Sequence, residues 1–282
     1  MWLLLAGLVV AAATADPSRA IEEIVAPAGG TVGFAALDLA SGRTLGSHER
    51  QAFPMQSVFK LPVAIEVLHQ VDRRTLDLDR TVALVAADTR GGPSGTMTVP
   101  AQKTVRALLE AMIINSDNVA CDKLLALIGG PRAVDARIRA EGVEGINIRF
   151  SEREMQAGEG DNTATPAAMV ALLAKIARRR VGLSAPSVAL LEDLLARVST
   201  GPHRIKGELP PGTPVAHKTG TSMTRDGTTD ATNDAGLITL PGGHRAAVAV
   251  FVHASPADEA TRERTIARLA RVAYDTFSST AR

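Results

Sequence analysis

The chain has 282 residues, of which 45% are hydrophobic and 22% are charged, an ordinary composition for a globular protein of one or two domains. It carries 31 basic and 30 acidic side chains, so its net charge gives no reason to expect nucleic acid or a membrane surface as a partner. Aromatic residues make up only 3% of the chain, too few for the stacking platforms that bind single-stranded nucleic acid.

The N-terminal segment has the pattern of a secretory signal peptide. Residues 2–10 form an apolar run of the right length, and the small residues at 13–15 provide a cleavage site before Asp16. The run is short for a membrane-spanning helix. No Lys or Arg precedes it, which departs from the usual charged start, and a buried or disordered segment is the alternative. We expect residues 1–15 to be removed and the mature protein to be periplasmic or secreted, without stable membrane association.

The next part of the chain predicts a β-hairpin followed by a largely helical stretch. Two strand-like runs between residues 31 and 49 are joined by Ser41-Gly42, a turn signal. Apolar residues at helical spacing then predict three helices. The second begins after Thr165-Pro166 and the third after Ser184-Ala185-Pro186, where a capping residue precedes a proline suited to the first turn. The three apolar stripes lie within 105–113, 169–176 and 190–198.

The pattern returns to strands near the end of the chain. Segments 214–222, 233–241 and 244–252 are rich in strand-forming residues, and Gly242-Gly243 between the last two predicts a hairpin turn. Ser255 and Asp258 have the spacing of a capping box, which predicts that a last helix opens there.

These elements predict an α/β (α+β) fold with one antiparallel sheet built from both chain ends, covering helices, and an all-α subdomain inserted between. We expect the sheet-containing part to comprise 16–56 and 205–282 and the helical part 57–204, together forming one domain. A cleft between the two parts is the expected place for a functional site.

Ser57 and Lys60 form the first motif with chemical potential. On a helix, residues three apart share a face, with their Cβ atoms about 5–6 Å apart. A serine hydroxyl is a poor nucleophile without a nearby base. Lys60 serves as that base only when part of it is neutral, which burial or a nearby cation such as Lys218 promotes. On this fragment alone, a helix-cap serine beside a solvated lysine is the alternative.

Three further polar segments follow in a fixed order. Ser116-Asp117-Asn118 lies between two helical runs, 151–156 lies in a polar loop, and Lys218-Thr219-Gly220 lies on a predicted strand. The ordered set S-x-x-K, S-D-N and K-T-G resembles the serine β-lactamases of class A and, more distantly, the penicillin-binding D-alanyl-D-alanine peptidases. The resemblance extends over nearly the whole mature chain.

The resemblance implies a hydrolase of cyclic amides that opens penicillins and cephalosporins through an acyl-enzyme on Ser57, conferring antibiotic resistance. No metal or cofactor is expected, the partner is a small-molecule β-lactam, and the protein is expected to be a monomer. Ser116 would relay a proton to the β-lactam nitrogen, and Lys60 and Glu152 would share the role of acylation base. The backbone N–H groups of Ser57 and Thr221 would form the oxyanion hole.

The same resemblance implies a set of substrate contacts. Asn118 would hold the substrate's side-chain amide, while Lys218 and Thr219 would meet its carboxylate. Arg204 resembles a position that supplies a second cation to that carboxylate, with a plain surface arginine as the alternative. The substrate-binding residues implied are Asn118, Gln156, Arg204, Lys218, Thr219, Gly220 and Thr221.

Glu152 matches the glutamate that activates water for deacylation, a task suited to a carboxylate because it can take a proton and return it. The Gln156 amide would help to hold that water. Glu154 is the competitor for the Glu152 role, and a solvated loop without a role is the remaining alternative.

The loop around Glu152 departs from the common family pattern. Phe150 and Asn162 occupy the positions at which many relatives have an arginine–aspartate pair, so that ion pair is absent. Gly158 and Gly160 add backbone freedom. We therefore expect a loop held by packing and hydrogen bonds, more mobile than usual, and we hypothesise that it admits bulky cephalosporin side chains.

Three other functions remain open at this stage. A D-alanyl-D-alanine peptidase would share the nucleophile without the deacylating glutamate, and a covalent β-lactam sensor would acylate and stop. A non-catalytic binding protein would keep only the fold. The single cysteine, Cys121, excludes an internal disulfide and is expected in the core, and Asp117 and His217 are expected to be structural.

Overall fold

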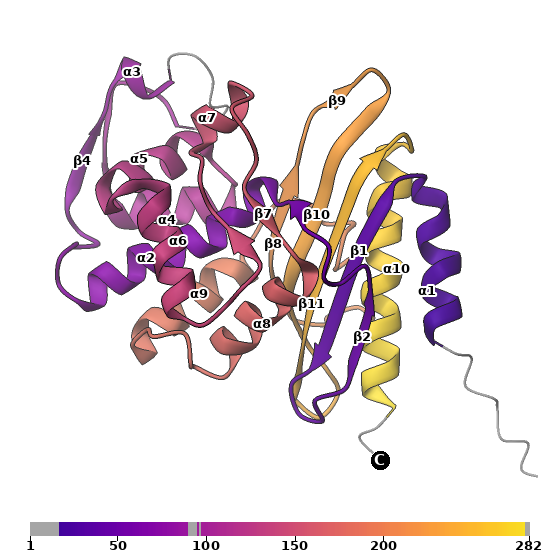
Figure 1. Ribbon diagram of the computed structural model, residues 1–282. Coiled ribbons are helices and arrows are strands. Elements are labelled where there is room, and N and C mark those ends of the chain that lie inside the picture. The colour runs from indigo at the N-terminus through magenta and orange to yellow at the C-terminus, as the bar shows by residue number, and fades with distance from the viewer. Residues whose placement is uncertain (1–16, 90–94, 96, 280–282) are drawn as a thin grey trace, which may run out of the picture.

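A computed structural model describes residues 17–89, 95 and 97–279 (Figure 1). The expected signal peptide, residues 1–15, lies outside the described residues. Every helix in the described part of the chain is too short or too polar to cross a bilayer.

A six-stranded antiparallel sheet contains strands from both chain ends, as the sequence predicts. The N-terminal part supplies β1 (Thr31–Asp38) and β2 (Thr44–Ser47). The C-terminal part supplies β8 (Val215–Thr221), β9 (Thr224–Arg225), β10 (Thr228–Thr239) and β11 (Arg245–Ser255). The order is β2-β1-β11-β10-β8, with β9 paired to β10, so β11 joins the two ends of the chain. Gly242 and Gly243 have φ of 86° and 84°, which suits the predicted hairpin turn.

Helices cover both faces of the sheet (Figure 1). On one face, α10 (Glu259–Ser278) packs against β10 and β11, and α1 (Pro17–Val25) packs on α10. On the other face, α8 (Pro166–Ala177) contacts β1 and β11. The short 3-10 helix η1 (Ala26–Ala28) links α1 to β1. The resulting cores on the two faces are almost wholly aliphatic.

The start of α10 differs from the sequence prediction. The helix is capped by Asp258, whose Oδ1 accepts a hydrogen bond from the backbone N–H of Thr261 at 2.7 Å. Ser255 instead ends β11, and its hydroxyl donates to the carbonyl oxygen of Ala28. The predicted capping box is therefore wrong, because a distant carbonyl holds the serine that the local pattern assigns to the helix.

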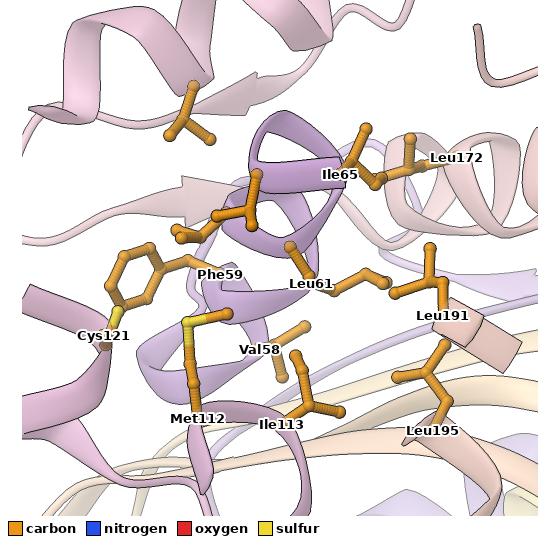
Figure 2. Close-up of a cluster of buried hydrophobic side chains, with 14 of the residues drawn as sticks. Val58, Phe59, Leu61, Ile65, Met112, Ile113, Cys121, Leu172, Leu191 and Leu195 are labelled. Atoms are coloured by element: carbon orange, nitrogen blue, oxygen red, sulfur yellow. The ribbon is translucent and has the colours of Figure 1, made fainter. Parts of the chain in front are cut away.

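The helical part of the molecule surrounds one central helix. The 3-10 helix η2 (Gln56–Phe59) leads directly into α2 (Lys60–Asp72), in which every residue from Lys60 to Leu68 is buried. Figure 2 shows Val58, Phe59, Leu61 and Ile65 among side chains from four other helices. These helices are α4 (Val105–Ile114), α5 (Asn118–Ile128), α8 and α9 (Ala185–Ala196). Truncating one buried leucine in such a core typically costs about 2–5 kcal/mol, so packing fixes α2 firmly.

The other elements lie around this centre. The helices are α3 (Ala86–Thr89), α6 (Gly130–Ala140) and α7 (Glu152–Gln156). A small hairpin pairs β4 (Thr81–Leu84) with β5 (Ala101–Thr104).

A second small sheet has the order β3-β7-β6, formed by β3 (Phe53–Pro54), β7 (Thr163–Ala164) and β6 (Ile146–Asn147). It joins the segment before Ser57 to both ends of the segment that carries Glu152. This sheet therefore fixes the position of Ser57 relative to the segment that carries Glu152.

Candidate active site

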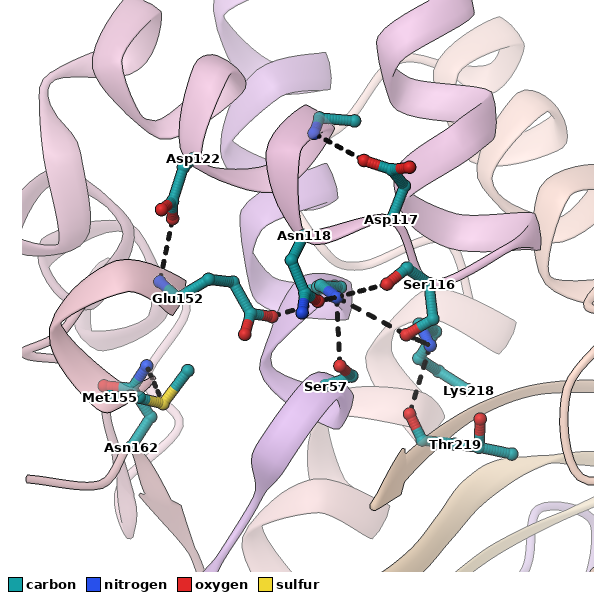
Figure 3. A network of polar contacts seen from close by, with 12 residues as sticks. Ser57, Ser116, Asp117, Asn118, Asp122, Glu152, Met155, Asn162, Lys218 and Thr219 are labelled. Atoms are coloured by element: carbon teal, nitrogen blue, oxygen red, sulfur yellow. Dashed lines mark hydrogen bonds and ion pairs between the residues drawn. The ribbon is translucent and has the colours of Figure 1, made fainter. Parts of the chain in front are cut away.

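Ser57 in η2 and Lys60, the first residue of α2, lie at the junction of these two helices. Figure 3 shows Ser57 among the polar side chains of the site. The Lys60 Nζ donates to the Ser57 Oγ at 2.9 Å, the contact that their spacing predicts. Lys60 is fully buried, whereas Ser57 is only partly buried. The serine hydroxyl can therefore meet a ligand while the lysine stays shielded from bulk water.

Lys60 is surrounded by oxygen atoms from three segments. Its Nζ lies 2.7 Å from the Ser116 carbonyl oxygen, 2.5 Å from Asn118 Oδ1 and 3.4 Å from Ser116 Oγ. Glu152 Oε1 is at 2.9 Å, an ion-pair distance, although the two groups lack the alignment of a hydrogen bond. An ammonium has only three N–H donors, so these oxygens and Ser57 Oγ share them. A small shift of Nζ therefore changes which of these oxygens accept its hydrogen bonds.

Ser116 lies between two lysines. Its backbone has φ of 59°, in the left-handed region, which turns both its carbonyl and its hydroxyl into the site. Ser116 Oγ accepts from Lys218 Nζ at 2.9 Å. Asp117 is structural, as expected, because its Oδ1 caps α5 at Ala120 N (2.8 Å) and its Oδ2 accepts from Met97 N (3.1 Å).

Lys218 and Thr219 are buried on β8. Burial lowers the pKa of the Lys218 ammonium well below its ordinary value, and the Lys60 charge lowers it further. Lys218 Nζ also donates to the Thr219 carbonyl at 3.1 Å, and Thr219 Oγ1 lies 2.5 Å from Thr200 Oγ1. The two lysines raise the positive potential at the Ser116 hydroxyl between them.

Gly220 lets β8 lie directly against η2. A Cβ at this position would come within 2.4 Å of the Met55 carbonyl oxygen and 3.1 Å of Val58 N. From the next strand, Asn233 Nδ2 donates to the carbonyl oxygens of Pro54 and Met55 at 2.7 and 3.1 Å. These contacts bring the end of β8, and with it Thr221, to the Ser57 side of the molecule. The sequence reasoning gave Asn233 no role.

Arg204 is buried beneath the end of β8 and is not a plain surface residue. Its Nε lies 3.0 Å from Glu263 Oε1 on α10. Its Nη1 donates to the carbonyl oxygens of Gly220 and Asn233, and its Nη2 donates to Thr221 Oγ1 at 2.8 Å. Four protein oxygens therefore occupy most of its five N–H donors. Glu263 is a partner that the sequence reasoning missed.

His217 faces the opposite side of β8 from Lys218, which is why it takes no part in the polar cluster around Ser57. Its Nδ1 lies 2.9 Å from both carboxylate oxygens of Asp234, and the same carboxylate accepts from Ile205 N at 3.1 Å. This buried pair fits the structural role expected for His217. Asp234, like Asn233, was not singled out from the sequence.

Glu152 opens a short helix, α7, where the sequence reasoning expected a polar loop. Ser151 and Glu154 form its capping box, with Ser151 N donating to Glu154 Oε2 at 2.7 Å. Glu154 therefore points to its own helix start, while the buried Glu152 points to Lys60. The S-x-x-E pattern in 151–154 was the signal that would have predicted this helix.

Asp122 on α5 holds the start of α7 and was missed by the sequence reasoning. Its two carboxylate oxygens accept from Glu152 N at 2.8 Å and Arg153 N at 3.0 Å. Burial raises the pKa of Asp122 to about 6, and the nearby Glu152 charge also raises it, against the lowering effect of the two backbone hydrogen bonds.

Replacing Asp122 by Asn is expected to change how stability depends on pH. Because the pKa is higher in the folded protein than the ordinary 3.8, the folded protein holds this proton more tightly, and stability falls as pH rises from about 4 to 6. The Asn variant lacks this loss, so its unfolding free energy relative to wild type should rise by up to about 2–3 kcal/mol over that range. Urea unfolding at pH 4.5 and 7 measures this. Asp193→Asn, in an exposed ion pair, is the control, and parallel pH profiles for Asp122→Asn and wild type would contradict the prediction.

Asn162 closes the segment that carries α7. Its Oδ1 accepts from Arg149 N and Phe150 N at 2.8 and 3.0 Å, and its Nδ2 donates to the Phe150 carbonyl at 2.8 Å. The Phe150 ring packs on Gly160, where a Cβ would come within 2.5 Å of it. Hydrogen bonds and packing thus hold this segment at positions 150 and 162, where the sequence predicts that the ion pair of many relatives is absent.

Asn162→Ala should therefore destabilise the protein. It removes the three hydrogen bonds that this fully buried side chain forms with backbone groups, together with its contact to Met155 Sδ at 3.5 Å, which predicts a loss of about 2–5 kcal/mol in unfolding free energy. Asn162→Asp keeps both accepted bonds but places a buried carboxylate oxygen against the Phe150 carbonyl oxygen, and should lose at least as much at neutral pH. Urea unfolding of the two variants at pH 7 tests this, and a loss below about 1 kcal/mol for Asn162→Ala would contradict the prediction.

A cleft of about 570 Å³ opens at Ser57. One side is formed by α7 and the segment that follows it, and the other side by the end of the sheet from β8 to β10. Five predicted site residues lie on its wall: Ser57, Asn118, Glu152, Gln156 and Thr221. Lys60, Lys218, Thr219, Gly220 and Arg204 are buried and do not line the cleft, and the partly buried Ser116 is also outside its lining. Lining residues that the sequence reasoning did not single out include Gln56, Met155, Asp161, Met223, Arg225 and Asp230.

Residues 16–277 match the model of the family described as the Beta-lactamase enzyme family. The chain is 40% identical to the extended-spectrum beta-lactamase PER-1 of Pseudomonas aeruginosa, over 90% of this chain and 85% of that protein. It is 32% identical to the beta-lactamase VEB-1 of the same organism, over 91% and 89% of the two chains.

Solved structures show the same likeness. A beta-lactamase from Chitinophaga pinensis superposes with a TM-score of 0.88 at 37% identity, covering 92% of this chain and 98% of that one. The TLA-1 extended-spectrum beta-lactamase superposes with a TM-score of 0.89 at 33% identity, covering 93% and 98%.

Proposed function

This chain belongs to the β-lactamase enzyme family and is a class A serine β-lactamase, and we propose that its turnover runs through an ester of Ser57. The observation that carries this assignment is the position of Lys60. Its Nζ lies 2.9 Å from Ser57 Oγ and 2.9 Å from Glu152 Oε1, so one buried amine links the nucleophile to a carboxylate. This is the arrangement of a nucleophile, a base and a group that orients the base.

In the acylation step, the Ser57 hydroxyl loses its proton toward the Lys60–Glu152 pair as its oxygen attacks the β-lactam carbonyl carbon. Two backbone N–H groups, of Ser57 and Thr221, stabilise the negative oxygen that develops; losing one such donor typically costs about 10²–10³ in rate. The ring C–N bond then breaks, Ser116 gives a proton to the leaving nitrogen, and Ser116 regains a proton from Lys60, whose Nζ lies 3.4 Å from its Oγ. The contact of Ser116 Oγ with Lys218 Nζ supports this relay, because the ammonium favours proton release by the hydroxyl.

In the deacylation step, Glu152 takes a proton from a water that attacks the ester carbonyl, and Ser57 leaves with a proton returned to it. A carboxylate can act in both directions. Glu152 lies on the cleft wall beside Ser57 and Gln156, which supports access of one water to all three. Asp122 contributes by fixing the backbone at Glu152.

Substrate binding is assigned to both sides of the cleft. Asn118 and Gln156 hold the side-chain amide and the water. The substrate carboxylate is assigned to the end of β8, where Thr221 lines the cleft and the buried Lys218 and Thr219 lie directly behind it. Because Arg204 bonds Thr221 and the Gly220 carbonyl, we assign it mainly to supporting the strand, with one N–H left for a substrate.

A chromogenic cephalosporin in excess over purified protein tests this function. Sustained colour is the expected result, and Ser57→Ala should remove it. A single stoichiometric burst would favour the peptidase or sensor, and no colour would favour a binding protein.

We also assign oxyimino cephalosporins to the substrate range. PER-1 and TLA-1 are named extended-spectrum enzymes, and Gly158 and Gly160, which carry no side chain, are among the residues that line the cleft here. Hydrolysis of cefotaxime and ceftazidime should be measurable beside that of benzylpenicillin. Negligible rates on both oxyimino compounds would remove this part of the assignment.

Export to the periplasm or medium and a monomeric state complete the proposal. The apolar run at 2–10 with small residues at 13–15 supports export. N-terminal sequencing of the mature protein should begin at Asp16, and its mass in solution should be that of one chain.

A further inference from the structure

A second cavity shares no lining residue with the cleft at Ser57. Its volume is about 450 Å³, and it lies between α6 and the segment that follows β6. Three arginines and one aspartate line it beside three apolar residues, an excess of two positive charges. The lining residues are Arg132, Asp135, Ala136, Arg139, Ile148, Arg149 and Phe150.

The single carboxylate of this cavity is already occupied by protein donors. Asp135 Oδ2 accepts from Arg139 Nε at 2.8 Å, and its Oδ1 accepts from Ile148 N at 3.0 Å. By contrast, the exposed guanidinium groups of Arg132 and Arg149 have neither an ion pair nor a hydrogen bond with the described part of the chain. The N–H donors of these two guanidinium groups are therefore available to a ligand in the cavity that both residues line.

This donor set suits an anion with an apolar body. Guanidinium groups bind carboxylates and phosphates through paired N–H donors, and two of them match a doubly charged ligand. Ile148, Ala136 and the half-buried Phe150 supply an apolar wall. The volume lies within the range of small-molecule sites, about 300–1,000 Å³.

Two residues of the cavity wall, Arg149 and Phe150, also hold the segment that carries Glu152 in place. The backbone N–H groups of Arg149 and Phe150 both donate to Asn162 Oδ1, and the Phe150 ring packs on Gly160. A ligand bound by the Arg149 side chain therefore contacts a residue whose backbone helps to hold this segment.

We propose that this cavity, named here the α6 cavity, is a second ligand site that binds a small organic dianion through Arg132 and Arg149. Two sources have this chemistry. One is a phosphate monoester, which carries nearly two negative charges at neutral pH. The other is the dicarboxylate that hydrolysis of a penicillin releases, which adds one carboxylate to the one the drug already has.

Titration of the full mature protein with phenyl phosphate, and separately with benzylpenicilloate, tests the site. Isothermal calorimetry gives the affinity, and amide NMR shifts give the location. We expect saturable binding of at least one probe, with shifts at Ile148, Arg149 and Phe150. Arg132→Gln combined with Arg149→Gln should weaken binding by about tenfold or more. Arg179→Gln combined with Arg180→Gln, which removes the same charge from an exposed site elsewhere, should change it less than twofold.

The two probes distinguish the sources. Binding of phenyl phosphate alone assigns a phosphate monoester, and binding of benzylpenicilloate alone assigns the reaction product. Inorganic phosphate should bind more weakly than phenyl phosphate if the apolar wall contributes. The proposal is overturned if neither probe saturates, if the shifts fall only around the Ser57 cleft, or if both double variants lose affinity equally.

Discussion

Glu152→Gln is expected to convert sustained hydrolysis into a single burst of acylation. The amide keeps the size of the side chain but cannot take a proton from water, so the ester on Ser57 should persist. General-base groups typically contribute about 10²–10⁴ in rate, and steady-state turnover should fall by that factor. Stopped-flow absorbance with a chromogenic cephalosporin measures the burst, and intact mass of the acyl-enzyme confirms the trapped species.

Glu154→Gln is the matched control for this result. The change has the same chemistry two residues away, and glutamine preserves the capping box that Glu154 forms with Ser151. Turnover of this control should stay within about twofold of wild type. Equal losses in the two variants, or undiminished turnover of Glu152→Gln, would remove Glu152 from the deacylation step.

Lys60→Met should slow acylation itself by about 10²–10⁴. Methionine fills the buried space, but it leaves Ser57 without its nearest base and leaves the buried Glu152 without its counterion. Leaving a buried charge unpaired typically costs about 3–5 kcal/mol, so the unfolding free energy should also fall. The rate of acyl-enzyme formation and urea unfolding measure the two effects separately.

Lys60→Arg separates the two roles of the lysine. Arginine keeps the positive charge beside Glu152 but stays protonated, so it cannot accept a proton from Ser57. Its stability should remain nearer to wild type than that of Lys60→Met, while its acylation should be slow. Acylation at the wild-type rate would show that a neutral amine at this position is not required.

The sheet and the main helices were predictable because their signals are local. Strand-like runs near the two chain ends and the paired glycines at 242–243 predict the hairpins, and Thr165-Pro166 and Ser184 mark helix starts that the structure has. Ser255 shows the limit of such signals. Its role depends on the Ala28 carbonyl, more than two hundred residues away in the sequence.

The residues that support the site from distant segments could not be predicted from the sequence. Asp122 reads as one polar residue on an amphipathic helix, and nothing in its own segment shows that it accepts the backbone N–H groups of Glu152 and Arg153. Asn233 and Glu263 are similar, because their partners come from distant segments. Helix α7 has only five residues, too few for periodicity to indicate a helix.

Cys121 packs in the core beneath the polar cluster, beside Phe59, and burial raises the pKa of its thiol well above the ordinary value (Figure 2). A thiol that is both inaccessible and protonated reacts slowly with oxidants and with other thiols. We therefore expect that adding a reductant leaves the activity of the folded protein unchanged.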